Sequence, residues 1–274
     1  MTRTRIIAAL IMAPFAIAAI LLLPTSWLVA VVALLFLIGL WEWFKLAEID
    51  DTLSRTVLLA ANLLLMVLLV WASAGSMVLF QLVTLVGAVW WCVALLWLRF
   101  YNFASDHETY GRVFKLAAGT LAVVPAWCAL ALIHAGSPAG NRWLLAALAI
   151  VWAADTGAYF AGRRFGKHKL APRISPNKTV EGMLGGLVAG VLAGVGFAWF
   201  AGMTLSQLPA VAAVAVAAVL FSVVGDLFES LLKRHVGAKD SGQLIPGHGG
   251  VLDRIDGVIA ALPVFAIGKE MFGF

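Results

Sequence analysis

The segment Gly225–Asp256 concentrates the residues of this chain that could do chemistry. It reads GDLFESLLKRHVGAKDSGQLIPGHGGVLDRID and holds acids, bases, a histidine and many glycines. Four polar residues in it fall at i, i+3, i+4 and i+7, namely Asp226, Glu229, Ser230 and Lys233. On a helix this spacing places them on one face. Because Asp226 still lies within apolar sequence, we expect it to have a function, although a solvated helix end with internal ion pairs is an alternative.

A glycine-rich loop follows this polar face. It contains Lys239-Asp240-Ser241-Gly242 and then Pro246-Gly247-His248-Gly249-Gly250. Glycines let the backbone approach a ligand closely and expose N–H groups to anions. A plain turn would look similar, but this loop lies between two acid clusters and beside Lys233 and Arg234. It is therefore a candidate ligand-binding loop.

Two carboxylates, Asp253 and Asp256, end the segment at a spacing of i and i+3. On one helical face, and directed toward Asp226, they predict a site for a hard cation. Mg²⁺ prefers carboxylate oxygens and usually shares its shell with substrate phosphates, while Arg and Lys side chains hold the phosphates that the metal does not reach. These are the parts needed for phosphoryl or nucleotidyl transfer, in which a protein mainly positions groups and neutralises charge.

A second polar cluster lies upstream, around Asp155. This aspartate is well inside hydrophobic sequence, where an unpaired carboxylate is unfavourable. The basic loop 162–167 after it suits anionic lipid heads or a triphosphate, although topology signalling explains it equally well. The segment 175–181 is more particular, because its proline stiffens the turn and Asn177 or Thr179 could cap the next helix.

Two further features are assigned to structure. Small residues recur at every fourth position of the next apolar run, which lets helices pack backbone to backbone: Gly182, Gly186, Gly190 and Gly194. Trp41, Trp43 and Phe44 beside Lys45 are typical of an interfacial anchor belt. Glu42 among them is interpreted as snorkelling or paired, with no functional role expected.

The run from Ser230 to Asp256 resembles the signature of the phosphatidate cytidylyltransferases, or CDP-diacylglycerol synthases. That signature requires Ser, Lys-Arg, Lys-Asp, a small residue, His-Gly-Gly, Asp-Arg and a last Asp at fixed spacing. The residues that match it without a gap are Ser230, Lys233-Arg234, Lys239-Asp240, Gly242, His248-Gly249-Gly250, Asp253-Arg254 and Asp256. The segments 155–159 and 175–182 are also similar to family sequence. The resemblance therefore covers at least the C-terminal half.

The resemblance implies that CTP and phosphatidic acid react to give CDP-diacylglycerol and pyrophosphate with Mg²⁺, and that a second cation such as K⁺ takes part. The implied metal site comprises Asp226, Asp253 and Asp256, supported by Asp155 and Glu229. Lys233 and Ser230 complete the catalytic set. Further basic residues would neutralise phosphates, and the loop would shape the nucleotide site; the implied substrate-binding residues are Arg234, Lys239, Asp240, His248, Gly249, Gly250, Arg254, Lys178 and Arg173. A homodimer is expected from the family.

Three rival functions can be weighed on the residues. CDP-alcohol phosphotransferases share an Asp-x-x-Asp-Gly start, but they require further aspartates, and after Gly257 the chain has only Glu270 as an acid. Lipid phosphorylation by CTP would transfer the γ-phosphate in place of the α-phosphate. A transporter could use Asp155 and Asp226 as coupling sites, but the polar residues gather on one side of the chain's spans and no inverted repeat is evident.

Composition indicates the solvent in which these residues must be positioned. The chain is 63% hydrophobic and 12% charged, with a mean hydropathy of +0.99, which exceeds what a soluble domain buries. The net charge of +5 is interpreted as basic cytoplasmic loops, and no nucleic-acid partner is expected. Cys92 and Cys128 lie in apolar runs and form no metal-binding or disulfide pattern.

The elements that position the polar residues are predicted to be about nine transmembrane helices. The apolar runs start near Ile6, Ser26, Thr56, Met77, Phe114, Arg142, Glu181, Leu208 and Gly257. Alternate loops carry about 17 of the 19 Lys and Arg residues, which predicts a cytoplasmic N-terminus and an active site facing the cytoplasm at the inner membrane. We expect an all-α, single transmembrane domain over 1–274, with 1–140 as scaffold and 141–274 as the catalytic half.

Overall fold

Long helices form most of the chain in the computed structural model, which describes residues 13–105, 108–136, 138–244 and 249–274. The helices are α2 (Thr25–Leu46), α3 (Thr52–Ala72), α4 (Val78–Arg99), α5 (Thr109–Ala135), α6 (Gly140–Phe165), α7 (Val180–Phe200), α8 (Leu208–His235) and α9 (Leu252–Phe272). A 3₁₀ turn, Leu205–Gln207, precedes α8. From the second apolar run onward, each predicted start lies within about five residues of the first residue of the corresponding helix.

Seven of these helices, α2 to α8, are long and apolar enough to cross a membrane among the described residues. The chain is therefore a multi-pass membrane protein. Of the roughly nine predicted transmembrane helices, seven are supported by these lengths and compositions. The first predicted span begins outside the described residues and continues as the shorter apolar helix Ala13–Leu22. The ninth corresponds to α9, which has charged residues in its first and last turns, so its spanning remains a prediction.

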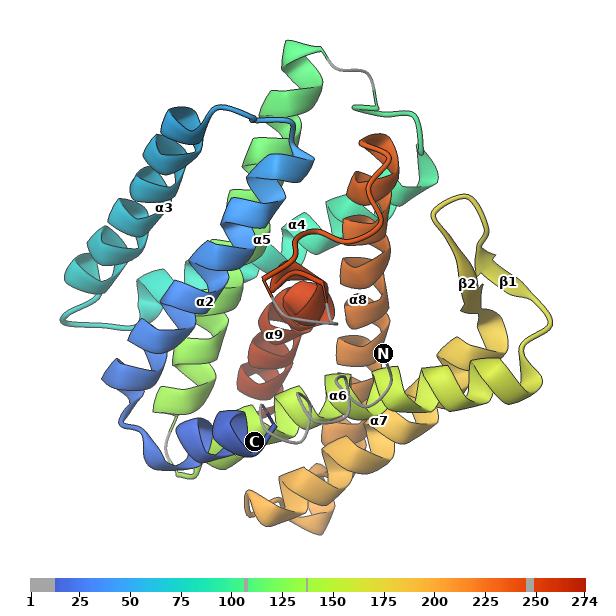
Figure 1. Ribbon diagram of the computed structural model, residues 1–274. Helices are drawn as coiled ribbons and strands as arrows, with labels where there is room; N and C mark the ends of the chain where they lie inside the picture. The colour runs from blue at the N-terminus through green and yellow to red at the C-terminus, as the bar shows by residue number, and fades with distance from the viewer. Residues whose placement is uncertain (1–12, 106–107, 137, 245–248) are drawn as a thin grey trace.

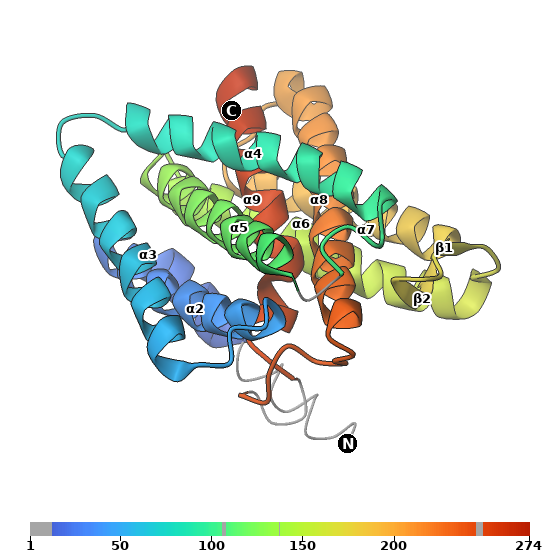
Figure 2. The same cartoon turned by 90° about the horizontal axis from the view of Figure 1, so that it is seen from above.

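The helices pack as two groups that meet at α8 and α9. In Figure 1, α2, α3 and α5 lie on the left, α6 and α7 run across the bottom toward the hairpin, and α8 and α9 stand between these groups. Helix α4 runs from the left side past α8, and Figure 2 shows it crossing α5, α9 and α8. The most extensive contacts join α6 to α7 and α8 to α9, and α9 also contacts α4 and α5. The C-terminal helices thus complete the core of both groups.

The glycine stripe of α7 packs against α6, as the sequence predicts. Gly182, Gly186, Gly190 and Gly194 are all buried. A Cβ at Gly186 would lie 2.8 Å from the carbonyl oxygen of Ala154, a separation that real Cβ atoms essentially never show. Thr179 caps α7 by accepting a hydrogen bond from the Gly182 amide at 3.1 Å. This close packing fixes the backbone of α6 directly beside Asp155.

An aromatic cluster fixes α8 against the N-terminal helices. Phe228 of α8 is fully buried, and its ring lies 5.9 Å from Trp43 and 5.3 Å from Trp97 between centroids. The indole Nε1 of Trp43 donates to the carbonyl of Lys115 at 2.8 Å. The predicted anchor belt is therefore wrong for Trp43 and Phe44, which are 1% exposed and belong to the core. Their aromatic area is buried between helices because α5 and α8 cover that face of α2.

A small antiparallel hairpin follows α6, a departure from the all-α prediction. Strand β1 (Lys169–Ala171) pairs with β2 (Ser175–Thr179), and Lys169 lies opposite Thr179. The hairpin projects beyond the ends of α6 and α7 in Figure 1. Arg234 of α8 donates from Nε to the carbonyl of Ile174 at 3.1 Å, which ties the hairpin to α8. Most of the predicted basic loop 162–167 is thus the last turn of α6, and the hairpin that follows it holds Lys178 near α8.

Candidate active site

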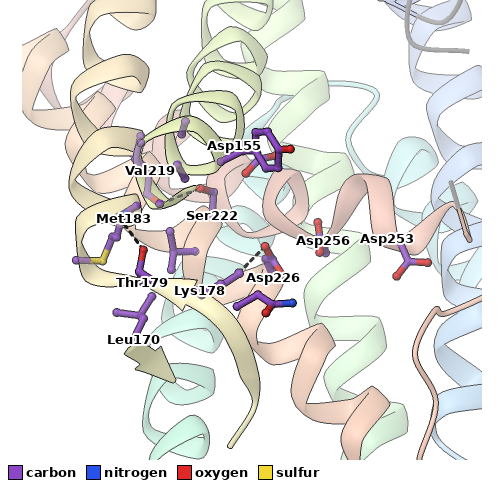
Figure 3. A pocket seen from close by; sticks show the side chains of 18 of the residues that line it. Asp155, Leu170, Lys178, Thr179, Met183, Val219, Ser222, Asp226, Asp253 and Asp256 are labelled. Atoms are coloured by element: carbon purple, nitrogen blue, oxygen red, sulfur yellow. Dashed lines mark hydrogen bonds and ion pairs between the residues drawn. The ribbon is translucent and has the colours of Figure 1, made fainter. Parts of the chain in front are cut away.

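One cavity of about 720 Å³ lies between α6, α7, α8, the hairpin and the start of α9. This volume is within the range of sites that hold small molecules and cofactors. Apolar side chains including Leu170, Met183 and Val219 line one part of it, and charged side chains line another. In Figure 3, Leu170 of the hairpin, Met183 of α7 and Val219 of α8 are the apolar side chains, and the labelled acids come from α6, α8 and α9. The cavity can therefore accept a ligand with an apolar and an anionic part.

Five aspartates of the described residues line this cavity, among them Asp240 of the loop and Asp253 at the start of α9. The other three are Asp155 from α6, Asp226 from α8 and Asp256 from α9. They are close enough that Asp226 and Asp155 both act electrostatically on Asp256. Asp226 forms an ion pair with Lys178 of β2, drawn in Figure 3, and Ser230 lies 3.5 Å from it between oxygens. Asp155 makes no hydrogen bond or ion pair within the described residues. We call Asp155, Lys178, Asp226 and Asp256 the pocket cluster.

The pocket cluster has the donor chemistry of a hard-cation site. Carboxylate oxygens are the preferred ligands of Mg²⁺, and this cluster has three carboxylates but one lysine, Lys178, which pairs with Asp226. Within the described part of the chain, no three His, Cys, Asp or Glu side chains converge tightly enough to hold a metal ion unaided. A cation here would therefore need oxygen ligands from a substrate as well, as Mg²⁺ sites commonly do.

A second group of charged residues also reaches the cavity, which Lys233 and Asp253 line, but its members are paired with one another. Lys233 of α8 pairs with Glu229 one turn earlier and with Asp253 of α9 at 2.7 Å. Asp253 Oδ2 also accepts from the Ser241 amide at 3.0 Å, the Ser241 hydroxyl at 2.9 Å and the Gly250 amide at 2.8 Å. With Glu42, described next, these residues form what we call the anchor cluster: Glu42, Glu229, Lys233, Ser241 and Asp253.

Asp253 lies outside the seven apolar helices, at the second residue of α9. Burial would raise the pKa of its carboxyl, but the Lys233 ammonium and the Gly250 amide outweigh that effect and lower the pKa to about 2. The carboxylate is thus held ionised by partners that occupy both of its oxygens. The sequence grouped Asp253 with Asp226 and Asp256 as metal ligands; the structure brings Asp226 and Asp256 together and directs Asp253 to Lys233 and the loop.

Glu42 is a residue that sequence reasoning set aside. Its side chain is 2% exposed, and Oε2 accepts from the Leu252 amide at 2.8 Å and the Ser241 hydroxyl at 3.1 Å. The residue stands alone as an acid in the second apolar run, and an ionisable group at such a position is unfavourable unless it has partners. That signal was present in the sequence, but nothing in the sequence indicated which distant loop would supply the partners.

The remaining predicted substrate-binding residues divide between the cavity and its surroundings. Asp240 and Arg254 line the cavity with Lys178. Gly250 is buried against Asp253, and Gly249 has a φ of +85°, which favours glycine. Lys239 and Arg234 are exposed, and Arg173 lies with Arg99 at a separate hollow of about 440 Å³. His248 is outside the described residues. The substrate roles of all these residues stay predictions.

Comparison with known proteins agrees with the resemblance of the signature. A model of the cytidylyltransferase family matches residues 3–272. A phosphatidate cytidylyltransferase of Pseudomonas aeruginosa is 40% identical over 268 residues, covering 97% of this chain and 96% of that protein. The enzyme of the same name from Haemophilus influenzae is 33% identical over 283 residues, covering 97% and 98%. A Staphylococcus epidermidis protein of that name is 46% identical over 128 residues, covering 47% and 49%. The chain belongs to the cytidylyltransferase family.

Proposed function

We propose that this chain transfers the cytidylyl group of CTP to phosphatidic acid, giving CDP-diacylglycerol and pyrophosphate. The observation that carries the proposal is the cavity of about 720 Å³ that Asp155, Asp226, Asp256 and Lys178 line together with apolar side chains. Relatives that match almost the whole chain are named for this reaction. An amphiphilic lipid phosphate and an anionic nucleotide are the substrates that such a mixed cavity suits.

The reaction joins a phosphate oxygen of the lipid to the α-phosphorus of CTP and breaks the bond from that phosphorus to the bridging oxygen of pyrophosphate. The lipid phosphate is already an anion near neutral pH, so no strong general base is required. The protein must bring two anionic substrates together and neutralise the charge that accumulates on the leaving group. Within the part of the chain that the structure describes, four cations line the cavity, Arg163, Lys178, Lys233 and Arg254, and of these Lys178 and Arg254 would contact phosphates.

Asp155, Asp226 and Asp256 would hold Mg²⁺ together with substrate phosphates, and the ion would neutralise charge on the transferring group. In the cavity, Lys178 pairs with Asp226. Binding of a lipid phosphate would give this ammonium a second anionic partner, and Asp226 would then have an oxygen available for the cation. The use of K⁺ as a second cation stays a prediction from the family resemblance.

Membrane placement is proposed on the same grounds. Basic residues gather after α2, α4, α6 and α8, and this bias indicates the cytoplasmic side. The N-terminus would then be cytoplasmic, and the cavity, bordered by the ends of α6 and α8, would open where CTP arrives while the acyl chains stay in the leaflet of the inner membrane. A homodimer remains an expectation from the resemblance, tested by the mass of the detergent-solubilised protein.

The deciding experiment uses purified protein in mixed micelles with phosphatidic acid, Mg²⁺ and CTP labelled with ³²P at either the α- or the γ-phosphate. Label from α-labelled CTP alone should enter a lipid product, and chelation of Mg²⁺ should abolish it. Transfer from γ-labelled CTP would identify a lipid kinase instead. If well-folded protein gives no labelled lipid from either substrate, also with K⁺ present, the proposal is wrong.

A further inference from the structure

Glu42 belongs to α2, in the part of the chain that carries no family motif, but its carboxylate ends inside the family signature. Oε2 accepts hydrogen bonds from the Leu252 amide and the Ser241 hydroxyl, at 2.8 Å and 3.1 Å. Leu252 is the first residue of α9, and the amides of a first helical turn have no partner within the helix. Glu42 therefore supplies from another helix the acceptor and the negative charge that the start of α9 favours.

The loop backbone closes tightly around this carboxylate. A Cβ at Gly242 would overlap Oε1 of Glu42, and a Cβ at Gly250 would overlap both Oε2 of Glu42 and the hydroxyl of Ser241. Both positions are glycine in this chain, and Gly250 is buried. The glycines before and after residues 245–248 thus leave the space that the Glu42 side chain fills.

The contacts of Glu42 continue to the cavity through described residues. The Ser241 hydroxyl lies between Oε2 of Glu42 and Oδ2 of Asp253, at 3.1 Å and 2.9 Å. Asp253 then holds Lys233. Arg254 and Asp256 belong to the same first turns of α9 and line the cavity. A shift of the start of α9 would therefore move Asp256 relative to Asp226.

We infer that Glu42 is a positioning residue of the nucleotidyl-transfer site, acting through Ser241 and the Leu252 amide to set the signature loop and the first turn of α9. Among the described residues, Glu42 does not line the cavity, so it acts on the reaction indirectly. The inference rests on the proposed function for its effect on turnover. Its structural part, the ordering of the loop by Glu42, stands on the contacts alone.

The test compares Glu42→Ala and Glu42→Gln with Thr25→Val, a matched change in the same helix. Thr25 lies at the opposite end of α2, where its hydroxyl is 2.9 Å from Nδ1 of His134, so the control removes one interhelical hydrogen bond far from the loop. Each protein is assayed for kcat, for KM with CTP and with phosphatidic acid, for thermal unfolding in detergent, and for amide hydrogen exchange without substrate.

We expect Glu42→Ala to lower kcat by about 10- to 100-fold, the range for loss of a residue that orients a catalytic group from outside it. KM for phosphatidic acid should stay close to wild type because Lys178 is not in the contact chain of Glu42. Exchange should accelerate in peptides that cover 241–256 and stay unchanged elsewhere. Glu42→Gln keeps one acceptor oxygen and the side-chain volume, so its kcat should lie between those of wild type and Glu42→Ala.

Three results would overturn the inference. One is wild-type kcat in Glu42→Ala, and another is a loss of kcat no larger than that of Thr25→Val. The third is faster exchange through all helices together, which would indicate general destabilisation. If the wild-type protein transfers no label to lipid, the proposed function fails, but the exchange measurement needs no substrate. Wild-type protection of 241–256 in Glu42→Ala would then refute the role of Glu42 by itself.

Discussion

The pocket cluster and the anchor cluster both include residues of α8 and α9, but the two clusters balance charge differently. In the anchor cluster, Lys233 bridges Glu229 and Asp253, and the loop amides and the Ser241 hydroxyl occupy the remaining oxygens of Asp253. In the pocket cluster, three carboxylates face one cavity, and Lys178 pairs with just one of them, Asp226. Satisfied groups stabilise a structure, whereas uncompensated ones leave interactions for a ligand.

This difference teaches that residues of one signature need not share one role. Asp253 and Asp256 are separated by a single helical turn, and yet Asp253 holds the loop while Asp256 faces Asp226. Substitution in the pocket cluster should therefore remove activity and preserve stability. Substitution in the anchor cluster should reduce both.

Asp256→Asn should have the largest effect on turnover. The amide keeps the shape but lacks the charge that a cation requires, and we expect label transfer to fall by about 10²- to 10³-fold, as for loss of one preorganised electrostatic group. Stability should equal or exceed that of wild type, because repulsion from Asp226 and Asp155 decreases. The measurements are initial rates with α-labelled CTP and thermal unfolding in detergent.

Asp50→Asn, at an exposed position after α2, is the matched control for this change and should behave as wild type. Unfolding of Asp256→Asn at a much lower temperature than wild type would place Asp256 among the structural residues and remove the distinction between the clusters.

Lys233→Met should reduce stability as well as activity. The substitution leaves the buried Glu229 and Asp253 without their shared cation, and breaking such a pair destabilises by about 3–5 kcal/mol. Denaturant unfolding in micelles measures this loss. Adding Glu229→Gln should recover part of the stability, because one of the two stranded charges is removed. Unchanged unfolding with complete loss of turnover would show instead that Lys233 acts on the substrate.

Lys178→Met tests the cation of the pocket cluster. A hydrogen bond to a charged group contributes about 1.5–3 kcal/mol, so kcat/KM for phosphatidic acid should fall about 10- to 150-fold. KM should account for most of the change, because the ammonium binds the lipid phosphate before and during transfer. Lys45→Met, at an exposed position near the end of α2, is the control. If KM for CTP rises and KM for phosphatidic acid stays at the wild-type value, Lys178 binds the nucleotide instead of the lipid.

Gly186→Val should have the smallest effect, through packing alone. Its Cβ meets the Ala154 carbonyl on α6, and overpacking of this kind destabilises by about 1–3 kcal/mol. Turnover should fall moderately because Asp155 follows Ala154. Gly196→Ala in the same helix meets no atom within 4 Å and should be neutral or stabilise by up to about 1 kcal/mol. Equal destabilisation by both changes would argue against close α6–α7 packing.

The sequence by itself determined the membrane character, most helix positions and the family of this protein. Long apolar runs can satisfy their backbone only as helices in a bilayer, and the spacing of acids and bases from Ser230 to Asp256 is local information. The glycine stripe of α7 likewise predicted close packing, because small residues at helical spacing have few other uses.

Only the tertiary structure decided which charged residues meet. Glu42 and Leu252 are brought together by the packing of α2 against α9, and Lys178 reaches Asp226 because a hairpin folds back toward α8. The sequence placed Glu42 and Trp43 at a membrane interface because their partners are distant in the chain. Periodicity shows which face of a helix is polar, but the neighbour of that face depends on how the other helices cross it.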